Sequence, residues 1–432
     1  MTLRNVSTTT GVCLLAVLSS LIVLAGCSSS SSTTSPPAAN NTVAAAVEQG
    51  PGGSGFRNFL FVTVTVCMPG STTNCVEIPN VQVDTGSEGL RVLSSALGSL
   101  APTSDAGLPT LADSNGDVFQ ECIQFADTTY AWGPVAVANI QIAGETASSV
   151  PIQVLDSTDA FPVPASCLTL GNPGPSGNLN TVAALGANGL LGVGVFPQDC
   201  GNDCASGETF PGYPYYLCPN GVCETVADLT GGGLPLPDQV WNPVAAFSSA
   251  DNNGVLITLP SIAAGGAASD SGSLIFGIGT QTDNALGSAQ VYATDDYGNI
   301  QTTYNSVSYP SFLDTGSTGI YFLDATTLAS TGIVECSSWY CPSSPVSFTV
   351  TNLGTNGTSA PLTFTIANAD TLLSSGNFAF NDLGGDSGIY PPTGTEYFDF
   401  GMPVFFGRSV FIGIEGATPP SGVSVTYGYF AF

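Results

Sequence analysis

The sequence predicts an all-β protein with several sheets and a few short helices. Glycine and proline are abundant, with 52 and 30 residues in a chain of 432, and this favours turns and short strands. From Phe56 onward, apolar runs of four to eight residues recur between turn signals and are rich in Val, Ile, Phe and Thr. A short motif also occurs twice, 230 positions apart, which indicates two related halves.

The composition excludes several classes of function. The chain has 4 basic residues, all of them Arg, against 32 Asp+Glu, and it has no His. Without His, Ser-His-Asp and Cys-His mechanisms and His-ligated metal sites are impossible. Without Lys, Schiff-base chemistry and a Walker-type phosphate loop are excluded. So few cations also argue against nucleic-acid binding. Carboxylates, hydroxyls and thiols remain as catalytic groups.

Residues 1–27 are predicted to be a bacterial lipoprotein signal peptide. Arg4 gives a positive start, and an apolar stretch over 12–23 follows. The segment ends in LAGC, which resembles a lipobox, so that Cys27 would be acylated. The alternatives are a plain secretory signal or a short membrane anchor. We therefore expect a lipid-anchored protein of the bacterial cell envelope, and Ser28 favours the outer membrane, at its periplasmic or its surface face.

Residues 28–55 are predicted to be a flexible tether. The segment begins with Ser and Thr only and continues with Pro, Ala, Asn and Gly. It carries almost no basic residue, so an inhibitory basic propeptide is not visible. The folded part of the chain is expected to begin at Phe56.

Ten cysteines remain after Cys13 in the signal peptide and Cys27 are set aside. An even number in an exported chain predicts up to five disulfides. Pairs close in sequence are expected first, then one pair by elimination, whereas the four cysteines in 200–223 allow three connectivities. A four-Cys metal knot is the rival interpretation of that last group, disfavoured by an oxidising compartment. The disulfide candidates are Cys67 with Cys75, Cys336 with Cys341, Cys122 with Cys167, and Cys200, Cys204, Cys218 and Cys223 in an open pairing.

Strands and helices follow from the apolar pattern in chain order. The pattern predicts strands over 59–66, 76–83, 135–142, 150–155 and 273–278. It predicts short helices over 94–100 and 324–330.

The repeated motif is Asp-Thr-Gly-Ser, and each copy follows an apolar strand. The copies lie at 84–87 and 314–317. Glycine permits a sharp turn and close approach of another chain segment, and the neighbouring hydroxyls and N–H groups can bond the carboxylate. Two such loops meeting at a pseudo-two-fold axis would bring Asp84 and Asp314 together, where they cannot both ionise. One carboxylate then serves as base and the other as acid, which suits activation of water against a peptide carbonyl.

These residues resemble the catalytic loops of pepsin-like, two-lobed aspartic peptidases. Further segments resemble that family in the expected order, over about 56–432. The resemblance implies a bilobal, pseudo-two-fold double β-barrel with an N-terminal lobe at 56–245 and a C-terminal lobe at 246–432. The supporting segments are a first hairpin within 59–93, a flap over 129–155, a strand crossing behind the first loop at 189–194, a second-lobe hairpin at 271–279 and a matching crossing strand at 405–412.

The resemblance also implies roles for individual residues. Arg91 stands where pepsins usually carry the Trp that supports the flap Tyr, and Trp132 would replace that support. Glu88, three positions before Arg91, either forms an ion pair with it at the cleft edge or is simply solvated. The implied site comprises the dyad Asp84 and Asp314, the bracing Thr85 and Thr315, the turn residues Gly86 and Gly316, the carboxylate-binding Ser87 and Ser317, and the flap residues Tyr130 and Trp132.

The predicted function is that of an envelope-anchored aspartic endopeptidase working in acid. We expect a monomer that acts on peptides or unfolded proteins and needs neither cofactor nor metal. The alternative is a non-catalytic lipoprotein that binds peptide or glycan in the same cleft. Calcium binding by the two Asp is disfavoured, because Ca²⁺ takes six to eight oxygen ligands and the repeat supplies few.

Overall fold

The computed structural model describes residues 40–432 except 54, 103–105, 157, 159–160, 169–176, 211 and 389–393. The predicted signal peptide, with Cys27, lies outside the described residues, as does the first part of the predicted tether. Residues 39–432 form one compact unit. No helix in the described part of the chain is both long and apolar enough to cross a membrane.

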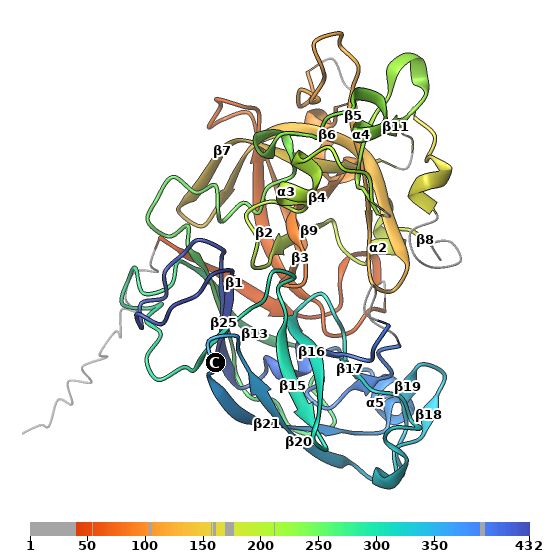
Figure 1. Cartoon of the computed structure of the whole chain (residues 1–432), viewed down its shortest axis with the longest axis vertical. Helices are drawn as coiled ribbons and strands as arrows, with labels where there is room; N and C mark the ends of the chain where they lie inside the picture. The colour runs from red at the N-terminus through yellow and green to blue at the C-terminus, as the bar shows by residue number, and fades with distance from the viewer. Residues whose placement is uncertain are drawn as a thin grey trace, which may run out of the picture. The chain divides into compact units, whose positions relative to one another are not determined.

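The described chain is mostly β-structure in two sheets, with few and short helices, which confirms the predicted all-β class (Figure 1). The larger sheet has sixteen strands. In order across it they are β11 (Glu224–Thr225), β10 (Tyr215–Leu217), β5 (Phe119–Gln124), β6 (Thr129–Ile142), β7 (Glu145–Leu155), β4 (Glu88–Leu93), β9 (Gly189–Val193), β3 (Cys75–Asp84), β2 (Leu60–Cys67), β1 (Thr42–Val47), β13 (Asp270–Phe276), β12 (Gly254–Leu259), β24 (Arg408–Gly413), β25 (Tyr429–Ala431) and β14 (Val291–Ala293), with β8 (Gly177–Asn178) beside β6.

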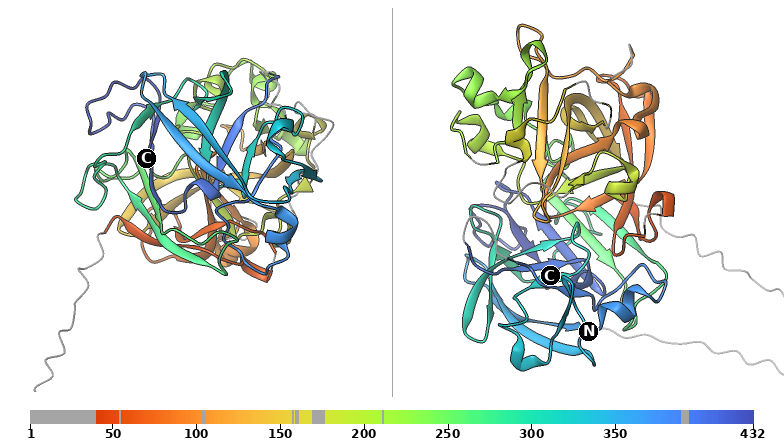
Figure 2. Two further views of the ribbon diagram at one scale, coloured as in Figure 1. Left: turned by 90° about the horizontal axis from the view of Figure 1, so that it is seen from below. Right: turned by 90° about the vertical axis from the view of Figure 1, so that its right-hand side faces the viewer.

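The smaller sheet has nine strands, all from the second half of the chain. In order they are β18 (Glu335–Cys336), β19 (Trp339–Tyr340), β22 (Gly384–Gly385), β17 (Ile320–Phe322), β23 (Phe398–Gly401), β16 (Val307–Asp314), β15 (Ile300–Tyr304), β20 (Val346–Leu353) and β21 (Ser359–Ile366). In the right-hand view of Figure 2 the first half occupies the upper part of the unit and the second half the lower part.

The described helices have at most five residues. The one predicted over 94–100 is present as an α-helix that continues into a 3-10 turn. The one predicted over 324–330 is wrong: that segment is turns followed by a short 3-10 helix, because β-branched Thr326 and Thr327 disfavour a helix and Gly332 ends it at φ 82°. The helices are α1 (Ser94–Leu97), α2 (Val182–Leu185), α3 (Gly201–Ala205), α4 (Val226–Thr230) and α5 (Ala369–Leu373), and the 3-10 helices are η1 (Pro51–Gly53), η2 (Gly98–Leu100), η3 (Ala165–Leu168), η4 (Pro219–Gly221), η5 (Leu236–Asp238), η6 (Ala329–Thr331) and η7 (Met402–Val404).

Each half repeats one three-strand arrangement around its motif. β3 ends at Asp84 and lies parallel to β9, which is antiparallel to β4. β16 ends at Asp314 and lies parallel to β23, which is antiparallel to β17. Asp84 lies opposite Gly192 and Asp314 opposite Gly401. The central strands β9 and β23 are buried along their whole length, as strands covered on both faces must be. The two motifs therefore occupy equivalent positions.

The second crossing strand is β23, so its predicted place at 405–412 was wrong. Phe405 instead follows the turn η7, and β24 pairs with β12 in the larger sheet. The prediction followed the longer apolar run, whereas the true strand is the short segment FDFG, in which Asp399 interrupts the apolar pattern. The first crossing strand, predicted at 189–194, is β9.

The predicted tether was wrong for its last part, because Thr42–Val47 forms β1. This strand pairs along its whole length with β13 and at its end with β2. Ala45 and Val47 are buried in the core while Ala44 and Ala46 are less buried, the alternation of a strand with one covered face.

The predicted lobe boundary at 245/246 is not a boundary between sheets. Five strands of the second half belong to the larger sheet: β12, β13, β14, β24 and β25.

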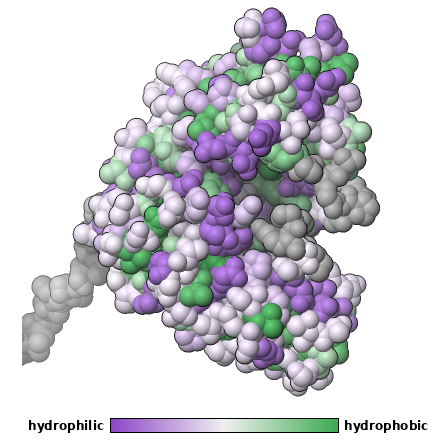
Figure 3. All heavy atoms as spheres, in the orientation of Figure 1, coloured by the Kyte–Doolittle hydropathy of each residue, from purple (hydrophilic) through white to green (hydrophobic). Residues whose placement is uncertain are grey.

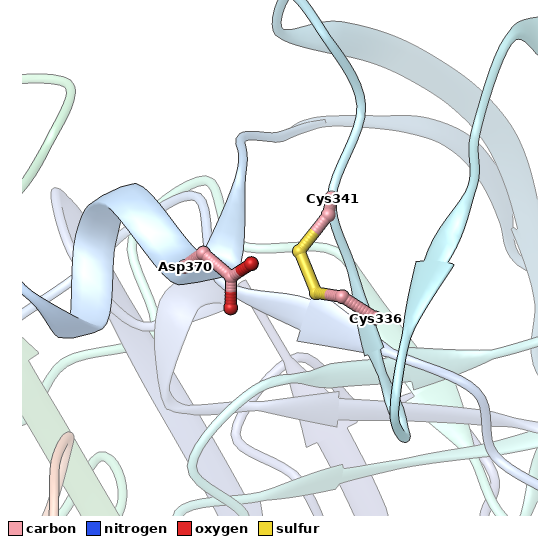
Figure 4. A group of neighbouring side chains, drawn as sticks. All are labelled: Cys336, Cys341 and Asp370. Atoms are coloured by element: carbon pink, nitrogen blue, oxygen red, sulfur yellow. A yellow bond between two sulfur atoms is a disulfide. The ribbon is translucent and has the colours of Figure 1, made fainter.

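Five disulfides form among the ten cysteines, as predicted. The pairs expected from short spacing and by elimination are confirmed. The open group resolves into Cys200–Cys204 and Cys218–Cys223, which excludes the four-Cys metal knot. Asp370 on α5 lies beside the Cys336–Cys341 disulfide, but two sulfurs bonded to each other cannot act as thiolate ligands (Figure 4).

Candidate active site

The two motif loops meet through their threonines. The Oγ1 of Thr85 donates to the carbonyl of Leu313 at 2.9 Å and accepts from the N–H of Thr315 at 3.0 Å. Reciprocally, the Oγ1 of Thr315 donates to the carbonyl of Val83 at 2.8 Å and accepts from the N–H of Thr85 at 3.2 Å. Both threonines are buried. Four hydrogen bonds between residues 228 to 232 positions apart thus fix one loop against the other.

Glycine in each loop permits the close approach of the opposite aspartate. A Cβ at Gly86 would lie 2.5 Å from the Cγ of Asp314, and a Cβ at Gly316 would lie 2.6 Å from an oxygen of Asp84. Contacts that short do not occur for a real side chain, so any other residue would push the aspartates away.

The molecular surface is hollowed between the two halves, as the space-filling view in the orientation of Figure 1 shows (Figure 3).

Each aspartate is held by donors of its own loop. The N–H of Gly86 donates to Asp84 at 2.8 Å, and the N–H of Gly316 donates to Asp314 at 2.7 Å. The hydroxyl of Ser87 lies 2.5 Å from the second oxygen of Asp84, and that of Ser317 lies 2.9 Å from the second oxygen of Asp314. The structure therefore brings together all eight residues of the repeated motif.

The two carboxyl groups converge on the same point, because a Cβ at Gly316 would lie 2.6 Å from the Oδ1 of Asp84 and 2.9 Å from the Oδ1 of Asp314. Burial, followed by the charge of Asp84 and then of Asp399, raises the pKa of Asp314 well above its ordinary value. Such a pair titrates as a unit and shares a proton over a range of pH. Chemically, the arrangement offers a base and an acid side by side, which can take a proton from a water molecule and deliver one to a leaving group.

A third carboxyl, which the sequence reasoning missed, adjoins this pair. Asp399 on β23 is 6% exposed, and its Oδ2 lies 2.5 Å from the hydroxyl of Ser317. Burial raises its pKa well above the ordinary value of an aspartate. The available signal was an acidic residue between two phenylalanines in an apolar run.

Glu88 and Arg91 do not pair side chain to side chain, so neither sequence interpretation holds. Arg91 is 1% exposed and donates to the backbone carbonyl of Glu88. Its guanidinium bonds the carboxylates of Glu121 at 2.6 Å and Asp199 at 2.9 Å. Glu88 instead accepts from the N–H of Phe196 at 3.2 Å, and burial raises its pKa to about 8.

Tyr130 and Trp132 lie on β6. The predicted flap segment, 129–155, corresponds to β6 and its antiparallel partner β7, whereas the hairpin whose turn adjoins Tyr130 is formed by β5 and β6. Trp132 is buried, packs edge-on against Tyr216 and donates from Nε1 to the carbonyl of Phe161, so it belongs to the core of the hairpin. The hydroxyl of Tyr130 accepts from the side chain of Asn178 at 3.4 Å. The structure places neither ring against the aspartates, so their role in a flap stays a prediction.

Asn58 is a second residue that sequence reasoning missed. It is fully buried with φ 57°, and its side chain donates to the carbonyls of Thr318 and Phe380 at 2.7 and 2.9 Å. Its Oδ1 accepts from the N–H of Phe380. Asn58 thus fastens the segment before β2 to the residue that follows the second motif, and no sequence signal pointed to it.

The sequence matches, over residues 37–432, the family described as "Protein of unknown function (DUF3443)". No curated protein matches. The chain is similar to a solved structure described as "Crystal structure of aspartic proteinase from Irpex lacteus", at 15% identity and a TM-score of 0.47, over 90% of this chain and 96% of that chain.

Proposed function

The chain belongs to the family described as "Protein of unknown function (DUF3443)", and we propose that this member is an aspartic endopeptidase. The observation that carries the proposal is the convergence of Asp84 and Asp314 in two cross-braced Asp-Thr-Gly-Ser loops, where each carboxyl lies against the glycine of the opposite loop. A pair that shares one proton can activate water with its ionised member and protonate the departing nitrogen with the other. The resemblance of the motif to pepsin-like peptidases supports the same reaction.

The substrate of the proposed reaction is a peptide or an unfolded protein. The reaction needs no cofactor, because the carboxyl groups supply both proton transfers. The reaction is expected at acidic pH, where the Asp84–Asp314 pair still holds one proton. We further propose that the protein acts at the cell envelope, held by a lipid on Cys27. Five disulfides support an oxidising, extracytoplasmic compartment.

The test is cleavage of an unfolded protein substrate between pH 3 and 7 by the chain without residues 1–27. We expect cleavage in acid that pepstatin-type inhibitors block, and a loss of at least a hundredfold in kcat/KM for Asp84→Asn or Asp314→Asn, since each removes half of the acid–base pair. The control is Asp370→Asn, an exposed aspartate on α5. A folded, disulfide-bonded protein that cleaves nothing at any pH would refute the proposal and favour peptide or glycan binding in the same cleft.

A further inference from the structure

We propose that Asp399 is a third titrating carboxyl of the candidate site, a positioning residue that keeps a proton next to Asp314 through the hydroxyl of Ser317. The inference rests on the proposed function, because it sets the pH range in which the pair would work. It concerns the regulation of that site by pH, and nothing in the repeated motif anticipates it.

The strand places the Asp399 side chain on the side of the active pair. Successive residues of a strand point to opposite faces. Phe398 and Phe400 both contact the aromatic core of the smaller sheet, through Phe322 and Phe364. Asp399 between them therefore points the other way, to the Ser317 hydroxyl. Its Oδ1 is buried and makes no hydrogen bond within the described chain.

The Ser317 hydroxyl contacts two carboxyls, so one of them must carry a proton for both hydrogen bonds to form. The Ser317 Oγ lies 2.9 Å from Asp314 and 2.5 Å from Asp399. A hydroxyl has one hydrogen and can donate to only one of these two carboxyls. If it donates to Asp314, Asp399 must be protonated and donate to the Oγ. The three carboxyls Asp84, Asp314 and Asp399 then hold two protons, one between the aspartates of the pair and one at Ser317.

The charges around Asp399 favour the same protonation. The titratable groups facing it are Asp314 on β16, Asp84 at the end of β3 and Tyr321 on β17. Each of these three groups is neutral when protonated and negative when ionised, so none of them can supply a positive charge. Without a cation, a buried carboxyl lowers its free energy by binding a proton. The arginines of the described chain bind elsewhere: Arg57 lies over the Phe378 ring, Arg91 pairs with Glu121 and Asp199, and Arg408 donates to the carbonyl of Val404.

The first half of the molecule lacks this device. The residue equivalent to Asp399 is Leu190, because Leu190 lies opposite Gln82, two positions before Asp84, as Asp399 lies opposite Phe312. Ser87 accordingly contacts Asp84 and no other carboxyl in the described chain. The two aspartates of the pair are therefore unequal. Burial and two neighbouring carboxyls raise the pKa of Asp314, and the first loop has no counterpart of Asp399 beside its serine.

The first experiment compares pH profiles of kcat/KM for the wild type, Asp399→Asn and Asp399→Leu. Asn offers Ser317 an N–H donor but cannot ionise, and Leu reproduces the residue of the first half. We expect the alkaline limb of the profile to move down by about one pH unit in both variants, so that the ratio of activity at pH 7 to that at pH 4 falls about tenfold. Asp370→Asn serves as the exposed control. A uniform loss at every pH would mean a merely structural role and would overturn the inference.

The second experiment needs no catalysis and measures melting temperature between pH 3 and 8. A carboxyl with a raised pKa stabilises the fold fully below its unfolded value, near pH 4, and this stabilisation is lost as pH rises through its folded pKa. The wild type should therefore lose stability relative to Asp399→Asn as pH increases. A difference that is the same at every pH would overturn the inference even if the protein cleaves peptides. Conversely, a protein without peptidase activity would refute the proposed function while this measurement still decides the protonation of Asp399.

Discussion

Thr85 and Thr315 join the two halves of the candidate site with side chains that are small, neutral and buried. Each hydroxyl is both donor and acceptor, so that each threonine satisfies one backbone carbonyl and one backbone N–H of the opposite loop. A valine has nearly the same shape but no hydroxyl. The threonine therefore matters for its hydrogen bonds rather than for its volume.

Replacing Thr85 by Val should destabilise the protein by about 2–4 kcal/mol. The change leaves the carbonyl of Leu313 and the N–H of Thr315 buried without a partner, at about 1–3 kcal/mol for each such group. The measurement is denaturant unfolding with the disulfides intact. The matched control is Thr349→Val, at an exposed position of β20, where a change within about 0.5 kcal/mol is expected. Equal effects at the two positions would show that the cross-bracing contributes nothing.

The residues of the site differ in how far the sequence could reveal them. Asp84 and Asp314 were predictable because the motif repeats and each copy follows an apolar strand. Asp399 was not, because its equivalent in the first half is Leu190 and a symmetry argument cannot find a residue that breaks the symmetry. Asn58 acts through a single buried side chain far from the motif in sequence, and such a contact exists only once the chain has folded.

At the scale of elements, a buried charge network links the β5–β6 hairpin to β4, the strand that follows the first motif. Arg91 on β4 binds Glu121 on β5 and Asp199 in the loop after β9. The hydroxyl of Tyr215 on β10 donates to Asp199 and accepts from the N–H of Val240. Burial, and then the charge of Glu121, raises the pKa of Asp199 well above its ordinary value. One cation thus joins β4, β5 and the loop after β9.

Replacing Arg91 by Met should destabilise the protein by about 3–5 kcal/mol at pH 7, because two carboxyls remain buried without a cation. The loss should be smaller at pH 4, because the pKa of Asp199 is raised and its carboxyl can then carry a proton, and melting temperatures at the two pH values measure the difference. Arg57→Met is the control, since Arg57 is only partly buried and has no carboxylate partner in the described chain. A loss of the same size at both pH values would contradict the assignment.

The strands that the sequence predicted are those in which apolar residues are frequent or alternate with polar ones, such as β2, β3 and the end of β7. β1 was missed because its alanines suggested a linker. Buried Ala45 and Val47 nevertheless alternate with less buried residues, as in a strand, and β13 pairs with β1 along its whole length. β23 was missed because Asp399 breaks its pattern. In both cases the missing information was the pairing partner. The partner of β1 is β13, more than two hundred positions later in the chain. The partners of β23 are β16 on one side and β17 on the other.

At the scale of the whole molecule, one sheet spans both halves of the chain. β1 sits at the junction, between β2 of the first half and β13 of the second. The sheet therefore includes residues from Thr42 onward, earlier than the sequence suggested, and Asn41 just before it donates to the carbonyl of Phe276. Any anchor attached at Cys27 would act on the protein through this junction rather than through one lobe.

The proposed anchoring predicts that Cys27→Ser releases the protein from the membrane. Acyl chains on Cys27 bind the bilayer through about 0.8 kcal/mol for each buried CH₂, and two or more chains hold a protein stably, whereas serine at this position offers no thiol for the lipid. The wild type should sediment with membranes, resist extraction by high salt and yield to detergent, and mass spectrometry of its first peptide should show the lipid mass on Cys27. Cys13→Ser, within the signal peptide, is the matched control and should behave as the wild type. If Cys27→Ser and wild type partition alike, the chain is held, or exported, by a different signal.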